Sequence, residues 1–378
     1  MTHILYVDDN TVDGEQLISD IDREAKIWPI EKDTNTSLQT IRSKIADVSL
    51  VLMDYDLHHD NEESDETAVD GLELLERFRA TFRHTDSSES IAPVLVLFSG
   101  ELEGLAKSLK CPSYAPFLAK LAKVDWVFPK GPKAESNTSE QIQILFEASI
   151  KVQRTWSDDD SDLEPEVREI LGLKNTDSSW PDQAFEGFRE LRPPLQSLQS
   201  RNDSAALIRW LLQVAIPFPS CLIDIADIAI LLRSRPDSLV EHYNTSGSKL
   251  REMLEPYIYT GILSNFDGPR FWRSGIMEMM WLLRGGTDTQ SKNVFEELNS
   301  ILGGGLQPLE VNNPVVISNP DTFQRTTQIA SMDDAAQLQP DDWPLVLDSP
   351  WVLRDIVKNN KRLQALLVNE DRDLAEEA

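Results

Sequence analysis

Hydrophobic residues in the first 155 positions form short continuous runs that alternate with stretches in which apolar residues recur at helical spacing. The apolar runs predict strands at residues 3–7, 27–30, 49–53, 93–98 and 125–128. The helical spacing predicts helices at residues 12–25, 36–45, 71–82 and 139–152. Apolar strands separated by amphipathic helices are typical of a parallel sheet that is covered on both faces. We therefore predict an α/β domain over residues 1–155, built on a doubly wound, five-stranded parallel sheet.

Polar residues follow four of the predicted strands at the point where each strand ends. They are Asp8, Asp9, Asp54, Ser99 and Lys130. Because right-handed crossovers bring the carboxyl ends of parallel strands to one edge of a sheet, we expect these side chains to share a crevice. Three carboxylates in one crevice repel one another unless a cation joins them, and such oxygen ligands suit Mg²⁺. A hydroxyl and an ammonium group opposite complete a cage for a phosphoryl group, whose transfer needs mainly positioning and charge neutralisation.

The segments around these residues resemble a known family. The sequences ILYVDDN, SLVLMDYDL, DGLELLERFR, VLVLFSG and FPKGP resemble, in this order, the motifs of the receiver domain of response regulators in two-component systems. Each motif alone is weak, but five of them in the right order at the right strand ends are specific. The resemblance covers about residues 1–155, under half of the chain, and implies a flavodoxin-like fold.

The resemblance also implies a role for each polar residue. Asp54 would be the phosphoacceptor, taking its phosphoryl group from a histidine kinase or a phosphotransfer protein. Asp54 is preferred to Asp56 because it directly ends the apolar strand. Ser99 and Lys130 would contact phosphoryl oxygens. The implied Mg²⁺ ligands are the side chains of Asp9 and Asp54, the side chain of Asp8 either directly or through water, and the backbone carbonyl of Asp56.

The chain departs from the family pattern at three places. Residues 58–69 (HHDNEESDETAV) expand a loop that is usually short. We interpret them as a solvated acidic insertion, in preference to a metal site at His58, His59 and Asp60, because loops tolerate insertions. The stretch from Ser99 to Lys130 is longer than in the family, and Val127 stands where the family has an aromatic residue. The usual coupling between the hydroxyl residue and that aromatic residue is therefore open.

The overall charge narrows the choice of partners. The formal net charge is −28 and the isoelectric point is near 4.5. Such a surface repels nucleic acid and anionic membranes, so DNA binding would need a local basic face. No apolar run approaches the roughly 20 residues that span a bilayer, and no secretory signal is recognised at the start. We expect a cytoplasmic protein without membrane contact.

Beyond residue 155 the composition changes. Residues 156–166 contain the acidic run SDDDSDLE and predict a linker. Residues 167–310 predict a mostly helical output domain. Residues 311–378 predict a loop-rich segment, mainly at 312–345, followed by a helix at 348–367.

A winged helix is one interpretation of residues 222–275. Three predicted helices, at 223–232, 237–243 and 249–257, precede two strand-like stretches around a turn at Asp267 and Gly268. The third helix carries Lys249 and Arg251, but Glu252 and Glu255 bring it close to charge balance. A DNA reader would normally be more basic. A winged fold used for protein contacts or dimerisation, or a helical fold without a wing, is therefore favoured over a winged helix that binds DNA.

We find no catalytic motif in the C-terminal half, and His242 is the only histidine after residue 84. The glycine run at residues 303–305 predicts a helix stop and not a phosphate loop. The expected function is that of a response regulator, not an enzyme, in which phosphorylation switches an output region that contacts other proteins or a second copy of the chain. Two alternatives stay open: a phosphorylation-controlled transcription factor, and a pseudo-receiver scaffold that is not phosphorylated.

Overall fold

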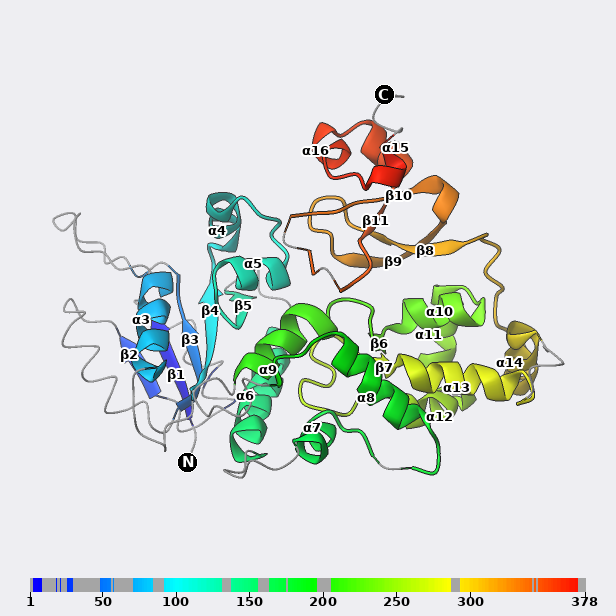
Figure 1. The fold of residues 1–378 in the computed structure, drawn as a ribbon, viewed down its shortest axis with the longest axis horizontal. Coiled ribbons are helices and arrows are strands. Elements are labelled where there is room, and N and C mark those ends of the chain that lie inside the picture. The colour runs from blue at the N-terminus through cyan, green and yellow to red at the C-terminus, as the bar shows by residue number, and fades with distance from the viewer. Residues whose placement is uncertain are drawn as a thin grey trace. The chain divides into compact units, whose positions relative to one another are not determined.

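The protein has a mixed α/β structure, as predicted. The computed structural model describes residues 3–8, 18, 21, 26–29, 48–55, 57, 71–83, 92–130, 137–155, 163–174, 176–195, 205–286, 293–341, 343–344 and 346–372 (Figure 1). Two compact units divide the chain. The first unit comprises Met1–Leu173, Arg192–Pro217 and Thr260–Asp267. The second unit comprises Lys174–Leu191, Phe218–Tyr259 and Gly268–Ala378.

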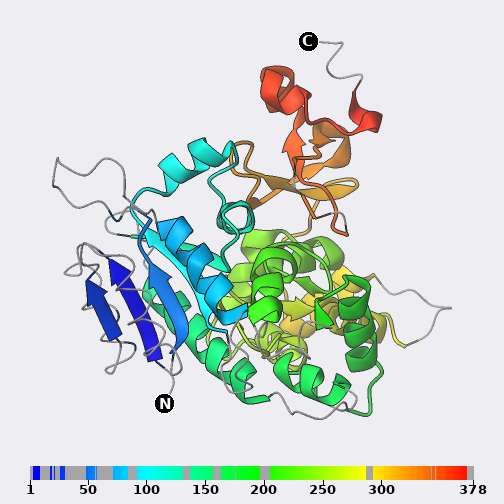
Figure 2. The same cartoon turned by 60° about the vertical axis from the view of Figure 1, so that its left-hand side comes forward.

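The first unit contains a parallel sheet whose strands run in the order β2-β1-β3-β4-β5. Its strands are β1 (His3–Asp8), β2 (Lys26–Pro29), β3 (Val48–Met53), β4 (Val94–Ser99) and β5 (Trp126–Pro129). In Figure 2 these strands, coloured blue to cyan, lie side by side. Every residue of β3 and β4 is buried. Uninterrupted apolar runs form these strands because neither face of the sheet meets water there.

Helices that precede and follow strands of this sheet in the sequence pack on it. Helix α3 (Gly71–Arg83) contacts β4, and α6 (Thr138–Thr155) contacts β3. The long stretch between β4 and β5 forms two helices, α4 (Leu102–Leu109) and α5 (Ala115–Leu121). The predicted helices at residues 12–25 and 36–45 and the insertion at 58–69 fall outside the described residues, apart from isolated positions in the first of these ranges.

Segments from beyond residue 155 also belong to the first unit. They are α7 (Glu164–Ile170), α9 (Ala205–Trp210), the π-helical turn η5 (Leu211–Ala215) and residues Thr260–Asp267. Arg209 Nε lies 2.5 Å from Oδ1 of the buried Asp125, just before β5. The ring of Phe266 packs edge-on against Trp126 at 5.3 Å between centroids. Residues predicted to form the output domain therefore complete the core around β5.

The second unit is mostly helical. Its longer helices are α8 (Trp180–Glu190), α10 (Ile225–Leu232), α11 (Pro236–Asn244), α12 (Lys249–Leu254), α13 (Arg273–Leu283) and α14 (Val294–Leu302). The three predicted helices of residues 222–275 form as α10, α11 and α12. The third is shorter than predicted, because a 3-10 turn, η6 (Glu255–Tyr257), follows Leu254.

The predicted pair of strands in the winged-helix segment forms only in part. Strand β6 (Leu222–Ile223) pairs antiparallel with β7 (Phe271–Trp272). The two arms on either side of Gly268 meet through the isolated bridge between Ile258 and Phe271, and Tyr259 N donates to Arg270 O at 2.8 Å. The winged helix stays a prediction.

The prediction of a loop-rich segment at residues 312–345 is wrong. A four-stranded sheet forms there and just beyond, in the order β10-β11-β8-β9. Its strands are β8 (Pro314–Ser318), β9 (Arg325–Ser331), β10 (Ala335–Gln337) and β11 (Trp351–Leu353). Val315, Ile317 and Ala335 form its small buried core. The predicted helix at 348–367 is also corrected: it begins as β11 and continues as α15 (Arg354–Lys358) and α16 (Lys361–Gln364).

An ion pair joins the start of β9 to the start of α10. Asp224 accepts hydrogen bonds from the backbone of Ala226 and Asp227 and so caps the helix. Arg325 Nη1 and Nη2 bind the two carboxylate oxygens of Asp227 at 2.8 and 2.6 Å. Burial raises the pKa of Asp227 above its ordinary value, while the hydrogen bonds from Arg325 oppose this shift. Arg325 therefore compensates the negative charges of both aspartates.

Replacing Arg325 by methionine is expected to destabilise the chain by about 3 kcal/mol at pH 7, because two carboxylates lose their partner. Burial raises the pKa of Asp227, and without Arg325 this pKa should rise further. As pH falls toward 4 the carboxyl groups take up protons and no longer need a cation, so the loss of stability should shrink. Urea unfolding at both pH values measures it. Arg362→Met is the control, because Arg362 and Asp321 form an exposed pair. Equal small losses in both variants would contradict the expectation.

Candidate functional site

Three predicted site residues from three different strands meet at one edge of the sheet. Asp8 is the last residue of β1, Asp54 follows β3, and Lys130 follows β5. Lys130 Nζ lies 2.5 Å from Asp8 Oδ2 and 3.2 Å from Asp54 Oδ2. The backbone of Asp54 is held in place because its N–H donates to Val7 O at 2.9 Å. One ammonium group thus joins two carboxylates.

The two carboxylates are largely removed from water. Asp8 is fully buried and Asp54 is 7% exposed. The hydroxyl of the buried Tyr6 donates to the Asp8 carboxylate. Asp54 Oδ1 accepts a hydrogen bond from Tyr55 N at 2.6 Å. Tyr6 was not singled out in the sequence, although residues two apart in a strand point to the same face and Tyr6 precedes Asp8 by two.

Burial and charge act in opposite directions on this site. Burial raises the pKa of Asp54 above 3.8, while Lys130 and a hydrogen bond from Ser99 oppose the shift. Burial also lowers the pKa of Lys130, but its hydrogen bonds and charge contacts with Asp8 and Asp54 outweigh burial, so that this pKa is raised. Lys130 therefore stays protonated at neutral pH. With two carboxylates against one ammonium, the cluster has a formal charge of −1.

Ser99 completes the group of described site residues. It is the last residue of β4 and is 1% exposed. Its Oγ accepts a hydrogen bond from Glu101 N at 3.2 Å, and its carbonyl accepts one from Lys130 N at 3.0 Å. The second bond ties the end of β4 to the residue after β5. Ser99 and Lys130 are thus positioned together.

A glycine at the start of α3 packs directly against the residue that is predicted to be phosphorylated. Gly71 N donates to Tyr55 O at 2.9 Å. A Cβ atom at position 71 would lie 1.9 Å from Asp54 O and 3.1 Å from Tyr55 Cα. Only glycine permits this approach. The sequence motif around Gly71 was recognised, but the role of this glycine was not.

The remaining predicted ligands cannot be placed. Asp9, and Asp56 with its backbone carbonyl, lie outside the described residues. Among the residues that the structure describes, no group of three or more histidine, cysteine, aspartate or glutamate side chains could hold a metal ion. The two described carboxylates are nevertheless the kind of ligand that Mg²⁺ takes. The Mg²⁺ site therefore stays a prediction.

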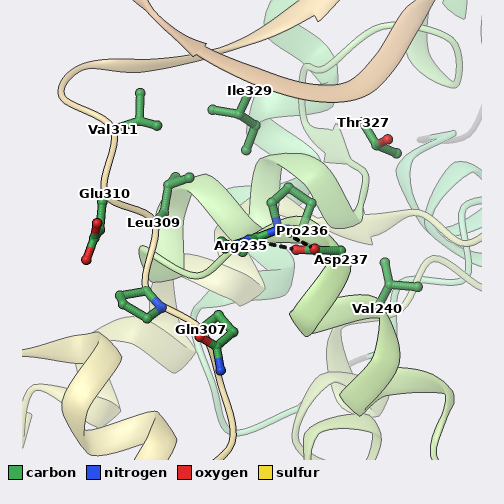
Figure 3. A pocket seen from close by; sticks show the side chains of 11 residues that line it. Arg235, Pro236, Asp237, Val240, Gln307, Leu309, Glu310, Val311, Thr327 and Ile329 are labelled. Carbon is green, nitrogen blue, oxygen red and sulfur yellow. Dashed lines mark hydrogen bonds and ion pairs between the residues drawn. The ribbon is translucent and has the colours of Figure 1, made fainter.

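The second unit contains an open pocket of about 780 Å³ between α11, β9 and residues 307–311 (Figure 3). Apolar side chains, including Val240, Leu309 and Ile329, form much of its lining. Arg235 Nη2 and Asp237 Oδ2 form an ion pair 2.6 Å long beside it. The described residues that line the pocket include no histidine, cysteine or lysine.

Comparisons with protein-family models, with curated proteins and with solved structures found no match to this chain. Among the described residues, no helix has the length and apolar character needed to cross a membrane. Among the described residues, the cluster of Asp8, Asp54, Ser99 and Lys130 is the best-defined candidate site because its contacts join the ends of several strands.

Proposed function

We propose that the chain is a response regulator that accepts a phosphoryl group on Asp54 from a histidine kinase or phosphotransfer protein. The observation that carries the proposal is the position of Lys130, whose Nζ contacts both Asp8 and Asp54 at the carboxyl ends of three parallel strands. In this proposal the first unit is a doubly wound, flavodoxin-like receiver. The motifs of residues 1–155 support the same function.

The chemistry that the site must perform is a phosphoryl transfer. An Asp54 oxygen attacks the phosphorus of a phosphohistidine, the new O–P bond forms as the P–N bond breaks, and the departing imidazole takes a proton from water. Lys130, 3.2 Å from Asp54 Oδ2, can pair with a phosphoryl oxygen, and Ser99 can donate to another.

The donor set fits Mg²⁺, because two buried carboxylates with a formal charge of −1 after pairing with Lys130 leave a charge for a hard cation to neutralise. Asp8 and Asp54 would hold the ion, and the family resemblance adds Asp9 and the backbone carbonyl of Asp56. When bound, Mg²⁺ supplies charge neutralisation for the incoming phosphoryl group.

The output in this proposal is a protein contact that changes with phosphorylation. A phosphoryl group can shift a conformational equilibrium only through contacts that differ between the two states. Lys130 directly follows β5, the ring of Phe266 packs against β5, and Arg209 pairs with Asp125 just before this strand. This gives the site a short physical connection to those segments.

DNA binding by a winged helix in residues 222–275 is the alternative output. The cations of the third helix are engaged within the second unit: Lys249 Nζ donates to Ile301 O at 3.2 Å, and Arg251 Nε donates to Tyr243 O at 3.1 Å. Such engagement favours the protein contact. A gel-shift and a pull-down, each with and without acetyl phosphate, would separate the two outputs.

Incubation with acetyl phosphate and Mg²⁺ is expected to add one phosphoryl group to the chain, measured as intact mass. The addition should be lost with EDTA and in Asp54→Asn, and it should persist in Asp56→Asn, the matched control in the same DYD sequence. If the phosphoryl group is still added to Asp54→Asn but not to Asp56→Asn, the phosphoacceptor is Asp56 and not Asp54. No addition to any variant would favour the pseudo-receiver scaffold.

A further inference from the structure

A basic pocket lies in the first unit, away from the candidate phosphoryl site. Its volume is about 570 Å³. Its lining residues come from α3, the end of α5, the turn before β5, α9 and η5: Glu76, Arg79, Ala80, Lys120, Lys123, Val124, Arg209 and Gln213. Val124 precedes β5, whereas Lys130 follows it. Because all strands of the sheet are parallel, the pocket lies toward the amino ends of the strands and Asp54 lies toward their carboxyl ends.

The charge of this pocket opposes that of the whole chain. Four cationic side chains and one carboxylate line the pocket, and the buried Asp125 pairs with one of the cations, Arg209, so that these groups together carry a formal charge of +2, while the chain carries −28. Lys123 Nζ lies 3.6 Å from Glu76 Oε1, but both side chains are more than half exposed, so that this pair neutralises little. A concentrated positive charge on an acidic protein marks a site that selects anions.

Two contacts position the pocket wall. Asp125 Oδ1 binds Arg209 Nε at 2.5 Å and so orients the guanidinium group. Gln213 Nε2 donates to Val124 O at 2.9 Å and ties η5 to the turn before β5. Lys123 itself adopts a left-handed backbone conformation, with φ of 55°, in that turn. These contacts fix the position of the Arg209 side chain and of the turn that carries Lys123.

We propose that this pocket binds a small ligand through a diphosphate group. The excess positive charge favours a multiply charged anion such as a diphosphate, and guanidinium groups like those of Arg79 and Arg209 suit phosphoryl oxygens. The volume lies within the range of small-molecule sites. A ligand held here contacts α3, α5, α9 and η5, so its binding stabilises the packing of these segments on one another.

The test is calorimetric titration of inorganic pyrophosphate into the full chain at fixed ionic strength. EDTA in the buffer removes divalent ions, so the readout does not depend on phosphorylation of Asp54. We expect one pyrophosphate per chain, and at least a tenfold weaker affinity in the double variant Lys120→Gln, Lys123→Gln, since each lost charged contact costs about 1.5 kcal/mol or more. The matched control is Lys107→Gln, Lys110→Gln, which removes two exposed lysines outside the pocket.

Unchanged affinity in the control and in Asp54→Asn would support the pocket as the site. The proposal is overturned if pyrophosphate does not bind, if both lysine pairs weaken it equally through general attraction, or if Asp54→Asn alters it. Tighter binding of a nucleoside diphosphate than of pyrophosphate would identify a nucleotide as the source of the diphosphate. Binding of an acidic peptide in place of pyrophosphate would also overturn it.

Discussion

Alanine at position 71 is expected to abolish phosphoryl acceptance by Asp54, although residue 71 carries no reactive group. The added Cβ would lie 1.9 Å from Asp54 O and 2.9 Å from Asp54 C, and both are backbone atoms that cannot turn aside. The overlap is relieved only if the start of α3 or the backbone of Asp54 moves. Overpacking of this kind costs about 1–3 kcal/mol or more, and displacement of the acceptor adds a loss of activity.

The measurement is the intact mass after incubation with acetyl phosphate and Mg²⁺, together with the midpoint of urea unfolding. Gly100→Ala is the matched control, because the nearest contact of a Cβ at Gly100 with the described residues outside its two chain neighbours is Lys130 O at 4.0 Å. That variant should be phosphorylated like the unaltered chain. Normal phosphorylation of Gly71→Ala would show that Asp54 does not depend on this close approach.

Replacing Lys130 by methionine is expected to destabilise the chain by about 3 kcal/mol at pH 7. The change leaves the buried carboxylates of Asp8 and Asp54 facing each other without a cation. The pKa of Asp54, already raised by burial, should rise further. Since a raised carboxyl pKa makes folding less favourable as pH increases above the ordinary value, the loss should be largest at neutral pH and small near pH 4.

Urea unfolding at pH 7 and pH 4 measures this loss. Lys107→Met is the control, because Lys107 is an exposed lysine on α4 away from the two carboxylates. If Mg²⁺ occupies the site, it should recover more stability in Lys130→Met than in the control, because the variant has more uncompensated charge. A loss that does not change with pH would show that side-chain packing, and not charge, explains the effect.

The meeting of Asp8, Asp54, Ser99 and Lys130 could be predicted because it follows from topology. Apolar runs fix the strands, and parallel strands in one sheet must end at one edge. The glycine stop at residue 303 was predictable for a similar local reason: Gly303 ends α14 in the left-handed conformation, with φ of 84°. These features need no knowledge of distant contacts.

Other parts of the structure depend on contacts between residues far apart in the sequence. The role of Gly71 appears only when α3 lies against Asp54, and the pairing of Arg209 with Asp125 joins segments 84 residues apart. The strands β8 to β11 were missed because they are short and β9 is mostly polar, with much of it exposed. Such strands form because their neighbours provide pairing, which local composition does not report.

The first unit is built from three separate segments of the chain, and this has a consequence for evolution. The chain returns to the first unit at Arg192–Pro217 and again at Thr260–Asp267. A single recombination event near residue 155 would therefore carry away Phe266 and Arg209 and leave Trp126 and Asp125 without the partners that cover them. Unlike modules joined end to end, the two units cannot be separated by one cut in the chain without removing part of the core of the first unit.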